Sequence, residues 1–479
     1  MNIIGRKKEM GIISSCLMSN KSEFVAVYGR RRVGKTYLIK ELFDNEFTFY
    51  ATGILNGSRE SQLDVWNKEI SRYKRDDIVA ADNWMEAFEN LNTIVESIKS
   101  SDNINDVSAN KKVIFLDEVP WMATMHSDFL SGLDFFWNRY ASSRGDVLLI
   151  ICGSAASWIT NNIINNRGGL HNRLTRQILV EPWSLAECED FFNSRNIPMT
   201  RFQMTEAYMV FGGIPYYLEL FEPHLSLYQN IDEIYFRLGA QLTDEFSNLY
   251  KSLYNNAEKY IDVIEAIASK GVGLTRNEIV KSANISDGGS LTRILKDLAL
   301  SGFIRNYKGY GKTKRDSIYQ LIDFFSMFDI KFRNRKNEFT KDFWLSFSST
   351  LPYKVWSGYC YEKVCLLHIE KLREKLGISG VLTSAYAWRD TSEEGGAQVD
   401  LVIDRNDGLI NLCEIKFSSE EYTITKSDYD SFRRKRSIFV NSTKTKKAVQ
   451  TTLITTFGIK RNTYSSEIVS EVTMDDLFD

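Results

Sequence analysis

The octapeptide at residues 29–36 constrains the fold more than any other segment of the chain. It has the GxxxxGK[ST] spacing of a phosphate-binding loop and reads Gly29-Arg30-Arg31-Arg32-Val33-Gly34-Lys35-Thr36. The apolar run at 24–28 predicts a strand before it, and apolar residues at helical spacing over 37–43 predict a helix after it. In that setting, glycines let backbone N–H groups surround phosphate oxygens, and the start of the helix adds partial positive charge. The motif therefore predicts a site for ATP or ADP, with Lys35 reaching the β- and γ-phosphates and the Thr36 hydroxyl ligating Mg²⁺.

Further apolar runs predict a parallel sheet around this loop. Strands are expected at 24–28, 47–52, 112–118, 147–154 and 177–180, with helical patterns between them. Near-continuous apolar strands that alternate with helices are typical of a parallel sheet covered on both faces. Ligands of such sheets lie at the carboxyl ends of the strands.

Two acids and a hydroxyl fall at those strand ends. Asp117 and Glu118 end one predicted strand, and Ser154 ends another. The acids fit a Walker B pair, in which Asp117 would hold Mg²⁺ while Glu118 would orient and deprotonate the attacking water. We expect Ser154 to hydrogen-bond the γ-phosphate or that water. The alternative for the two acids is an ordinary helix-capping role.

Charge and cysteine content limit the functional classes. The formal net charge is −2, so any nucleic-acid binding would depend on local basic patches. The 6 cysteines are scattered in apolar runs, which is typical of buried thiols in a reducing compartment. Cys360, Cys365 and His368 have helical spacing, so we interpret them as core residues rather than zinc ligands. No run approaches the roughly 18 apolar residues of a membrane helix, and we expect a soluble cytoplasmic protein.

Beyond residue 182 the pattern changes twice. Residues 183–254 look helical, with a break at Gly212-Gly213, and predict a small helical lid. Residues 255–335 predict three helices and a β-hairpin, the order of a winged helix-turn-helix. Candidate DNA contacts on its recognition helix and wing are Ser290, Thr292, Arg293, Lys296, Lys308, Lys312, Lys314 and Arg315. Alternatively, this module only packs between domains.

Several segments together resemble the archaeal-type AAA ATPases, a family close to the STAND signalling ATPases. They are Ile4-Gly5-Arg6, the loop at 29–36, and residues 116–121, 153–154, 172–175, 182–187 and 212–215. The resemblance implies ATP hydrolysis with Mg²⁺, allows a homo-oligomer, and implies a restriction-endonuclease-like C-terminal domain. It also makes Arg173 a candidate for contact with a nucleotide phosphate, in cis or from a neighbouring subunit. The alternative for Arg173 is a surface or lid-packing role.

Residues 341–479 resemble the D…ExK core of the PD-(D/E)xK nucleases. Asp400 lies in one apolar strand, and Glu414 and Lys416 lie in the next. Strand alternation places Glu414 and Lys416 on one face, where the two acids would converge on Mg²⁺ and the lysine would polarise water. Glu362 matches the acid that the first helix contributes in that fold. The alternatives are edge charges that are solvated or paired with each other, and a nuclease fold that binds DNA without cleaving it.

The sequence thus predicts an α/β protein with four parts. They are a P-loop AAA-type parallel sheet (1–182), a helical lid (183–254), a winged helix-turn-helix (255–335) and an α/β restriction-endonuclease-like domain (341–479). The functional hypothesis is an ATP-driven switch that controls a DNA-binding, metal-dependent nuclease-like domain. The alternative hypothesis is an ATP-dependent regulatory or DNA-binding scaffold whose nuclease fold does not cleave.

Overall fold

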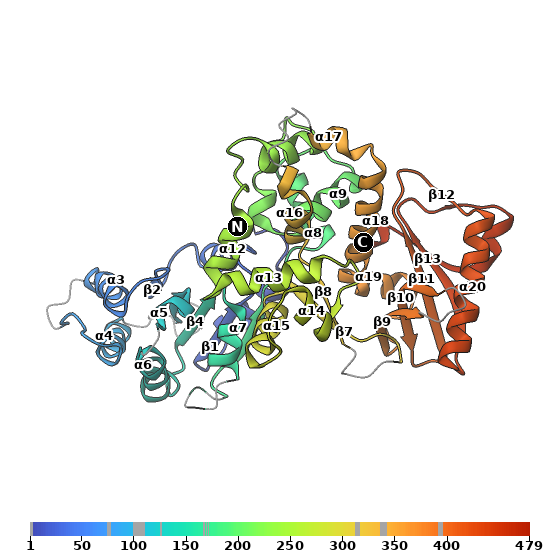
Figure 1. Cartoon of the computed structure of the whole chain (residues 1–479). Helices are drawn as coiled ribbons and strands as arrows, with labels where there is room; N and C mark the ends of the chain where they lie inside the picture. The colour runs from blue at the N-terminus through green and yellow to red at the C-terminus, as the bar shows by residue number, and fades with distance from the viewer. Residues whose placement is uncertain are drawn as a thin grey trace. The chain divides into compact units, whose positions relative to one another are not determined.

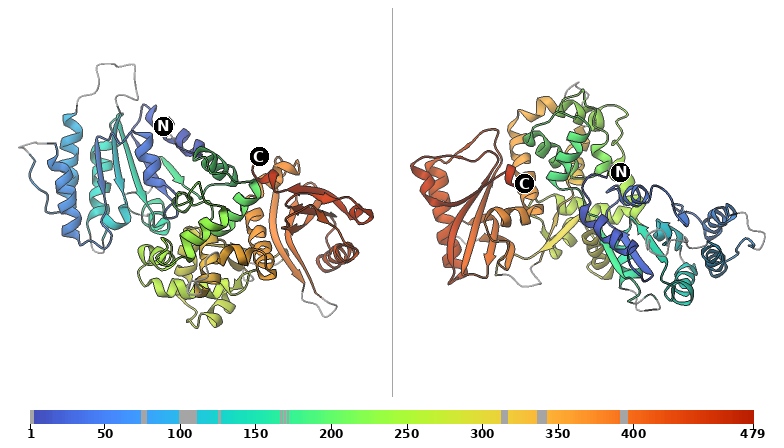
Figure 2. Two further views of the ribbon diagram at one scale, coloured as in Figure 1. Left: turned by 90° about the horizontal axis from the view of Figure 1, so that it is seen from above. Right: turned by 180° about the vertical axis from the view of Figure 1, so that it is seen from behind.

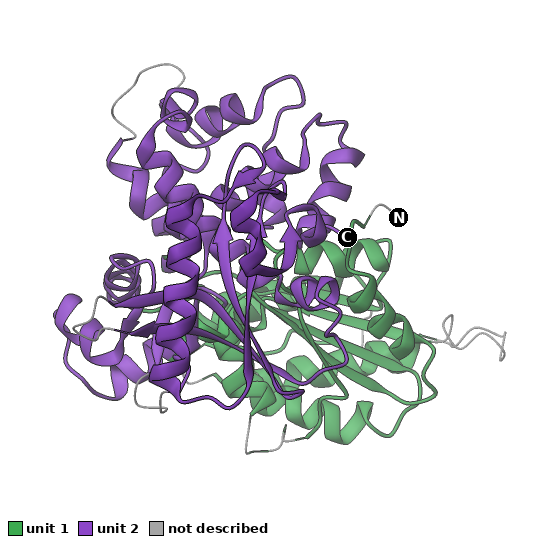
Figure 3. Cartoon of the chain, turned by 90° about the vertical axis from the view of Figure 1, so that its right-hand side faces the viewer, with its two compact units in different colours: residues 1–182, 251–255, 296–301 green, residues 183–250, 256–295, 302–479 purple. Residues whose placement is uncertain are grey.

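A computed structural model describes residues 3–73, 78–98, 111–124, 127–165, 168, 170, 172–311, 317–335, 343–390 and 396–479. The chain forms two compact units, which Figure 3 shows in different colours. Unit 1 comprises residues 1–182, 251–255 and 296–301, and unit 2 comprises the rest of the chain. Each unit contains a five-stranded sheet of its own.

Unit 1 is built on a parallel sheet with the strand order β2-β3-β4-β1-β5. The strands are β1 (Glu23–Tyr28), β2 (Phe49–Thr52), β3 (Lys112–Asp117), β4 (Val147–Gly153) and β5 (Arg176–Leu179). β3 and β4 are buried along their whole length because helices cover both faces of the sheet (Figures 1 and 2). This sheet confirms the parallel α/β core predicted from the apolar runs.

The helices of unit 1 pack on this sheet through a large apolar core. They are α1 (Lys7–Leu17), α2 (Lys35–Leu42), α3 (Arg59–Ser71), α4 (Trp84–Ser97), α5 (Val119–Met122), α6 (Phe129–Phe136) and α7 (Ala156–Ile159). Trp84 of α4 and Phe129 of α6 are fully buried, with their rings edge to face and their centroids 4.8 Å apart. The same core includes Ile114 and Leu116 of β3, so it anchors the strand that ends at Asp117.

The first part of unit 2 is helical. It contains α8 (Leu185–Ser194), α9 (Arg201–Phe211), α10 (Pro215–Leu218), α11 (Leu227–Ile231) and α12 (Glu245–Leu253), whose last residues belong to unit 1. The predicted break at Gly212-Gly213 has a steric cause, because a Cβ on Gly213 would lie 1.8 Å from the carbonyl oxygen of Trp183. The Trp183 N–H donates to the Gly213 carbonyl at 2.6 Å across this close approach.

Three helices and a small sheet follow. They are α13 (Ala257–Ala268), β6 (Leu274–Thr275), α14 (Arg276–Ser282), α15 (Gly289–Leu300), β7 (Ile304–Tyr307) and β8 (Ile318–Leu321). The sheet is antiparallel with the order β6-β8-β7. Thr275 and Glu278 form a reciprocal capping box at the start of α14. The predicted wing cations Lys312, Lys314 and Arg315 lie outside the described residues.

The C-terminal part of unit 2 is a mixed sheet with the order β15-β13-β11-β10-β9. Its strands are β9 (Thr383–Asp390), β10 (Ala397–Arg405), β11 (Leu409–Lys416), β13 (Ala448–Thr455) and β15 (Ile468–Thr473), and β12 (Tyr422–Thr423) pairs with β14 (Ile459–Lys460). β9, β10 and β11 form an antiparallel meander, and β13 and β15 add in parallel to β11. Helices α18 (Leu351–Leu367) and α19 (Ile369–Lys375) lie on one side of this sheet and α20 (Lys426–Thr443) lies on the other (Figure 1).

The helical spacing of Cys360, Cys365 and His368 does not continue as one helix, because α18 ends and α19 begins at His368. The buried imidazole of His368 fixes this break, with Nδ1 lying 2.8 Å from the Val364 carbonyl and Nε2 accepting from the Leu185 N–H at 3.1 Å. His368 is therefore a core residue. Cys360 and Cys365 are buried free thiols, as are the other described cysteines, which confirms their interpretation from the sequence.

The remaining helices of unit 2 are α16 (Phe324–Phe332) and α17 (Phe343–Ser348). α9 packs against α8, α16 and α18. Within the described ranges, we find no helix with the length and apolar character needed to span a membrane.

Candidate active site

The loop between β1 and α2 is shaped to surround an anion. Gly29 has φ +149°, and a Cβ there would lie 2.2 Å from the Val180 carbonyl oxygen, so the position requires glycine. Gly34, with φ +86°, precedes the first turn of α2, whose N–H groups receive no side-chain cap. Such N–H groups are donors for phosphate oxygens. Arg6 supports the loop, because its Nη2 donates to the Val33 carbonyl at 2.9 Å.

Lys35 is buried at the start of α2, and its ammonium group is held by oxygen acceptors. Nζ donates to the carbonyl oxygens of Gly29 and Arg30 at 3.2 and 2.8 Å, and to Ser154 Oγ at 3.1 Å. Burial lowers the pKa of Lys35, and the nearby charges of Glu118 and Asp117 act in the opposite direction. The ammonium therefore lies at the carboxyl ends of the strands, where the phosphates of a nucleotide are expected.

Asp117 and Glu118 have different partners. The Thr36 hydroxyl donates to Asp117 Oδ2 at 2.9 Å, which joins the two predicted Mg²⁺ ligands. Glu118 accepts from Ser154 with both oxygens, from the hydroxyl at 2.5 Å and from the N–H at 3.1 Å. Burial and the adjacent Glu118 charge raise the pKa of Asp117. A divalent cation at Thr36 and Asp117 would offset both effects, so these donors fit Mg²⁺.

The strand order explains why Ser154 contacts Glu118. β4 lies between β1 and β3, so its carboxyl end stands between the phosphate-binding loop and the acids. Glu118 has φ +49°, an uncommon conformation for a residue other than glycine. It occupies the position before α5 but makes no side-chain cap hydrogen bond there. The helix-capping alternative is therefore wrong for Glu118.

The arginines near the loop behave differently from one another. Arg30 is 6% exposed, so this first variable position of the loop is buried. Arg31 is half-buried, with its guanidinium 5.9 Å from the ring centroid of Trp121. Arg32 is half-buried with φ +72°. Arg173 lies in an exposed turn before β5, and its contact with a nucleotide phosphate stays a prediction.

Comparison with known proteins shows what the segment that carries this site is similar to. The model of an ATPase domain found predominantly in Archaea matches residues 3–221. Residues 3–221 form an archaeal-type ATPase domain. This finding confirms the resemblance inferred from the sequence for that part of the chain, whereas the winged helix and the nuclease-like domain stay predictions.

Individual relatives extend the comparison. Over 437 residues the chain is 23% identical to an uncharacterized protein of Methanocaldococcus jannaschii, covering 90% of this chain and 91% of the relative. An uncharacterized ATP-binding protein of the same organism is 42% identical over 43 residues, which are 9% of this chain and 73% of the relative. The fold is similar to that of a Walker-type ATPase of Pyrococcus abyssi, with a TM-score of 0.50 and 17% identity over 69% of this chain and 96% of that one.

A second group of ionisable residues lies on the C-terminal sheet, apart from the ATPase domain in the sequence. Asp400 on β10 and Glu414 on β11 are adjacent to the paired residues Leu401 and Cys413, which places both carboxylates on one face. Asp400 Oδ2 accepts from the Ile415 N–H at 3.0 Å. The β9–β10 register shifts at this point, and such bulges are frequent next to active sites.

Glu414 is paired with a lysine that the sequence analysis missed. Glu414 is 2% exposed, and its two oxygens accept from Lys435 Nζ of α20 at 2.7 and 2.6 Å. Burial raises the pKa of Glu414 to about 7, with a further contribution from Asp400, while Lys435 and Lys416 act in the opposite direction. The alternative of a solvated Glu414 is therefore wrong. Lys435 lies in the basic run 433–436 of a helix that follows the ExK strand, and this run is the sequence pattern that could have indicated a cation near Glu414.

Glu362 on α18 belongs to the same electrostatic cluster. Burial raises its pKa to about 7, the charges of Lys363 and Lys416 oppose this rise, and the charge of Asp400 adds to it. Lys363 Nζ lies 3.5 Å from Glu362 Oε2. The structure thus brings together the acids and the lysine that the nuclease resemblance implies, although no three His, Cys, Asp or Glu side chains form a metal-binding group among the described residues.

Proposed function

We propose that the ATPase domain binds ATP with Mg²⁺ and hydrolyses it as a molecular switch. The observation that supports this most strongly is the hydrogen-bonded path from Lys35 through Ser154 to Glu118. Lys35 neutralises charge on the β- and γ-phosphates, and Thr36 and Asp117 hold Mg²⁺. Glu118 orients the attacking water and accepts its proton, while Ser154 holds the Glu118 carboxylate in position.

Substitution of Glu118 and of Lys35 separates hydrolysis from binding. Glu118→Gln keeps an acceptor for Ser154 but cannot take a proton, so we expect unchanged ATP binding and turnover lower by about 10²–10⁴-fold. Lys35→Ala removes a charged donor and is expected to weaken ATP binding by about 10- to 100-fold. Lys40→Ala is the control, because Lys40 lies on the same helix but its Nζ lies over the Tyr50 ring, 4.4 Å from the ring centroid. Turnover at the wild-type rate in Glu118→Gln would refute the assignment; calorimetry and phosphate release are the measurements.

We further propose that the C-terminal part of unit 2 is a metal-dependent nuclease site directed to DNA. The support is the shared face of Asp400 and Glu414, with Lys416 on the same strand and Lys435 paired to Glu414. Asp400, Glu414 and Lys416 lie on an antiparallel meander that is followed by a helix and a parallel strand. In this proposal Lys416 polarises the attacking water, and the predicted wing and recognition-helix residues bind DNA phosphates.

The donor set fits Mg²⁺. Asp400 and Glu414 lie on one face of the sheet, and Glu362 belongs to the same electrostatic cluster. Mg²⁺ is commonly held by one or two carboxylates together with waters and substrate phosphates. The cation would supply Lewis acidity for attack on a phosphodiester.

A cleavage assay with coupled variants tests both proposals together. Plasmid, linear and single-stranded DNA are incubated with Mg²⁺ or Mn²⁺, with and without ATP. We expect wild-type cleavage, its loss in Asp400→Ala, and altered cleavage in Lys35→Ala if the nucleotide state controls the site. Asp404→Ala is the matched control, because Asp404 lies on the same strand but pairs with Lys447 at 2.6 Å. DNA binding without cleavage by the wild type would support the scaffold alternative instead.

A further inference from the structure

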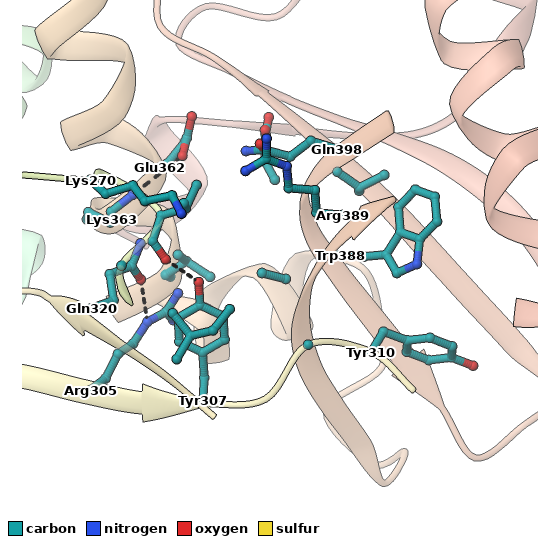
Figure 4. A pocket seen from close by; sticks show the side chains of 18 of the residues that line it. Lys270, Arg305, Tyr307, Tyr310, Gln320, Glu362, Lys363, Trp388, Arg389 and Gln398 are labelled. Carbon is teal, nitrogen blue, oxygen red and sulfur yellow. Dashed lines mark hydrogen bonds and ion pairs between the residues drawn. The ribbon is translucent and has the colours of Figure 1, made fainter. Parts of the chain in front are cut away.

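A cavity of about 290 Å³ opens within unit 2 beside the proposed nuclease acids (Figure 4). One wall comes from the loop and strands around β6, β7 and β8, and the other comes from α18, β9 and β10. Glu362 and Asp400 are part of its lining. The volume is at the lower end of the range for small-ligand sites, so it suits one nucleotide and is too small for a duplex.

Arg305, a half-buried cation, is part of the lining of the cavity. Arg305 on β7 donates through Nε to Gln320 Oε1 at 2.7 Å, and its guanidinium lies 4.5 Å from the ring centroid of Tyr307. Both partners are neutral, and among the described residues Arg305 forms no ion pair. Burial lowers the pKa of Arg305, which shows that its surroundings disfavour an uncompensated charge. An anionic ligand would provide the missing compensation.

Other cations surround the same space. Lys363 lines the cavity and is 3% exposed, and Arg389 lies beside Gln398 across the opening from Glu362 (Figure 4). Lys270 is also part of the lining, but it pairs with Glu278 at 3.0 Å. Lys363 Nζ likewise lies 3.5 Å from Glu362 Oε2, so Arg305 and Arg389 are the lining cations that form no ion pair among the described residues.

The cavity also offers apolar and aromatic surface. The Tyr307 hydroxyl donates to the Val272 carbonyl at 2.6 Å, which fixes the ring at the wall. Trp388, Ile318 and Val399 contribute apolar surface to the lining. Aromatic faces next to arginines are typical of sites that stack a nucleobase.

We propose that this cavity binds a single nucleotide of a DNA strand, with its phosphate at Arg305 and Arg389 and its base against Tyr307. The inference rests on the proposed nuclease function and deepens it, because it places an unpaired nucleotide next to Asp400. The site thereby selects single-stranded or frayed DNA over intact duplex. A free phosphate has the same anionic chemistry but would not use the aromatic wall.

The test uses the full chain with Lys35→Ala and Asp400→Asn, so that neither the phosphate-binding loop nor cleavage contributes. The probe is 5′-phosphorylated dithymidine, measured by calorimetry, with thymidine and inorganic phosphate as separate arms. We expect Arg305→Met to weaken probe binding by about 10- to 100-fold, as for loss of a charged hydrogen bond. Arg389→Glu, at an exposed position with little risk to folding, is expected to weaken it as well. Lys281→Met, an exposed residue of α14, is the control.

Three outcomes would overturn the inference. They are probe binding by Arg305→Met and Arg389→Glu that equals that of the protein with both arginines, no binding of the probe at all, or inorganic phosphate binding as tightly as the dinucleotide. Its failure is distinguishable from failure of the nuclease proposal. Cleavage by the wild type with unaffected probe binding removes only the cavity. Probe binding that depends on Arg305, without cleavage, retains the cavity and removes only the nuclease.

Discussion

Glu206 on α9 is a buried carboxyl whose protonation should control the stability of unit 2. It is 4% exposed, and it accepts hydrogen bonds from Tyr353 of α18 and from the Tyr228 hydroxyl of α11 at 3.3 Å. Burial raises the pKa of Glu206 to about 7, and the two tyrosine hydrogen bonds oppose this rise. The perturbation is Glu206→Gln, which keeps an acceptor for the tyrosines and removes the titration.

The expected magnitude follows from the pKa. A rise from 4.5 to about 7 corresponds to about 3 kcal/mol at 1.36 kcal/mol per pH unit. The folded state binds the proton more tightly than the unfolded state, so this stability is fully present below about pH 4.5 and is lost as pH rises to about 7. The Gln variant has no such loss. About 2.5 kcal/mol of this stability is lost in wild type between pH 5 and pH 8, so we expect the melting temperature of Glu206→Gln to rise relative to that of wild type by roughly 5–10 °C over that range.

Scanning calorimetry of the full chain at several pH values measures this difference. Subtracting the melting temperature of wild type from that of the variant at each pH cancels the contribution of all other titrating groups. Glu258→Gln, an exposed residue of α13, is the matched control and should show no trend with pH. If the Glu206→Gln and wild-type melting temperatures run parallel from pH 5 to pH 8, the buried carboxyl does not act as argued.

Three further predictions concern single contacts. Gly29→Ala forces a Cβ to 2.2 Å from a carbonyl oxygen at positive φ, so it should abolish ATP binding and lower the folding stability by about 2 kcal/mol or more. Gly11→Ala has open space around it and should stabilise α1 by up to about 1 kcal/mol. Thermal unfolding and ATP titration measure these effects. Ser154→Ala should leave ATP binding within a few fold but slow turnover by about 10- to 100-fold, with recovery in Ser154→Thr, because the link between the lysine and the catalytic acid is lost; unchanged turnover would contradict the role of the hydroxyl. Lys435→Met leaves the buried Glu414 carboxylate without its cation and should cost about 3 kcal/mol of stability. Lys426→Met, at an exposed position of the same helix, should cost little. Equal melting temperatures for the two variants would show that the pair is not formed.

Much of the fold of unit 1 could be predicted from the sequence, because its strands are continuous apolar runs bounded by turns. The five strands fall at the predicted places, with differences of one or two residues at most ends. Less of the C-terminal part of unit 2 could be predicted from the sequence. Only β10 and β11 were predicted there, since β13, β15 and the polar helix α20 lack a strong periodic signal. The break at His368 was missed because a contact with Leu185, distant in sequence, determines it.

The sequence by itself determined the residues of the phosphate-binding loop and the two acids, because loop conformation and strand-end position follow from local spacing and glycine. Tertiary structure alone decided which groups meet those residues. Ser154 joins Lys35 to Glu118 because β4 lies between the strands that carry them. Lys435 neutralises Glu414 because α20 packs across the sheet, and within the described ranges Arg305 contacts the neutral side chains of Gln320 and Tyr307. The pairing and burial of a charge depend on chain segments that are remote in sequence, so no local pattern encodes them.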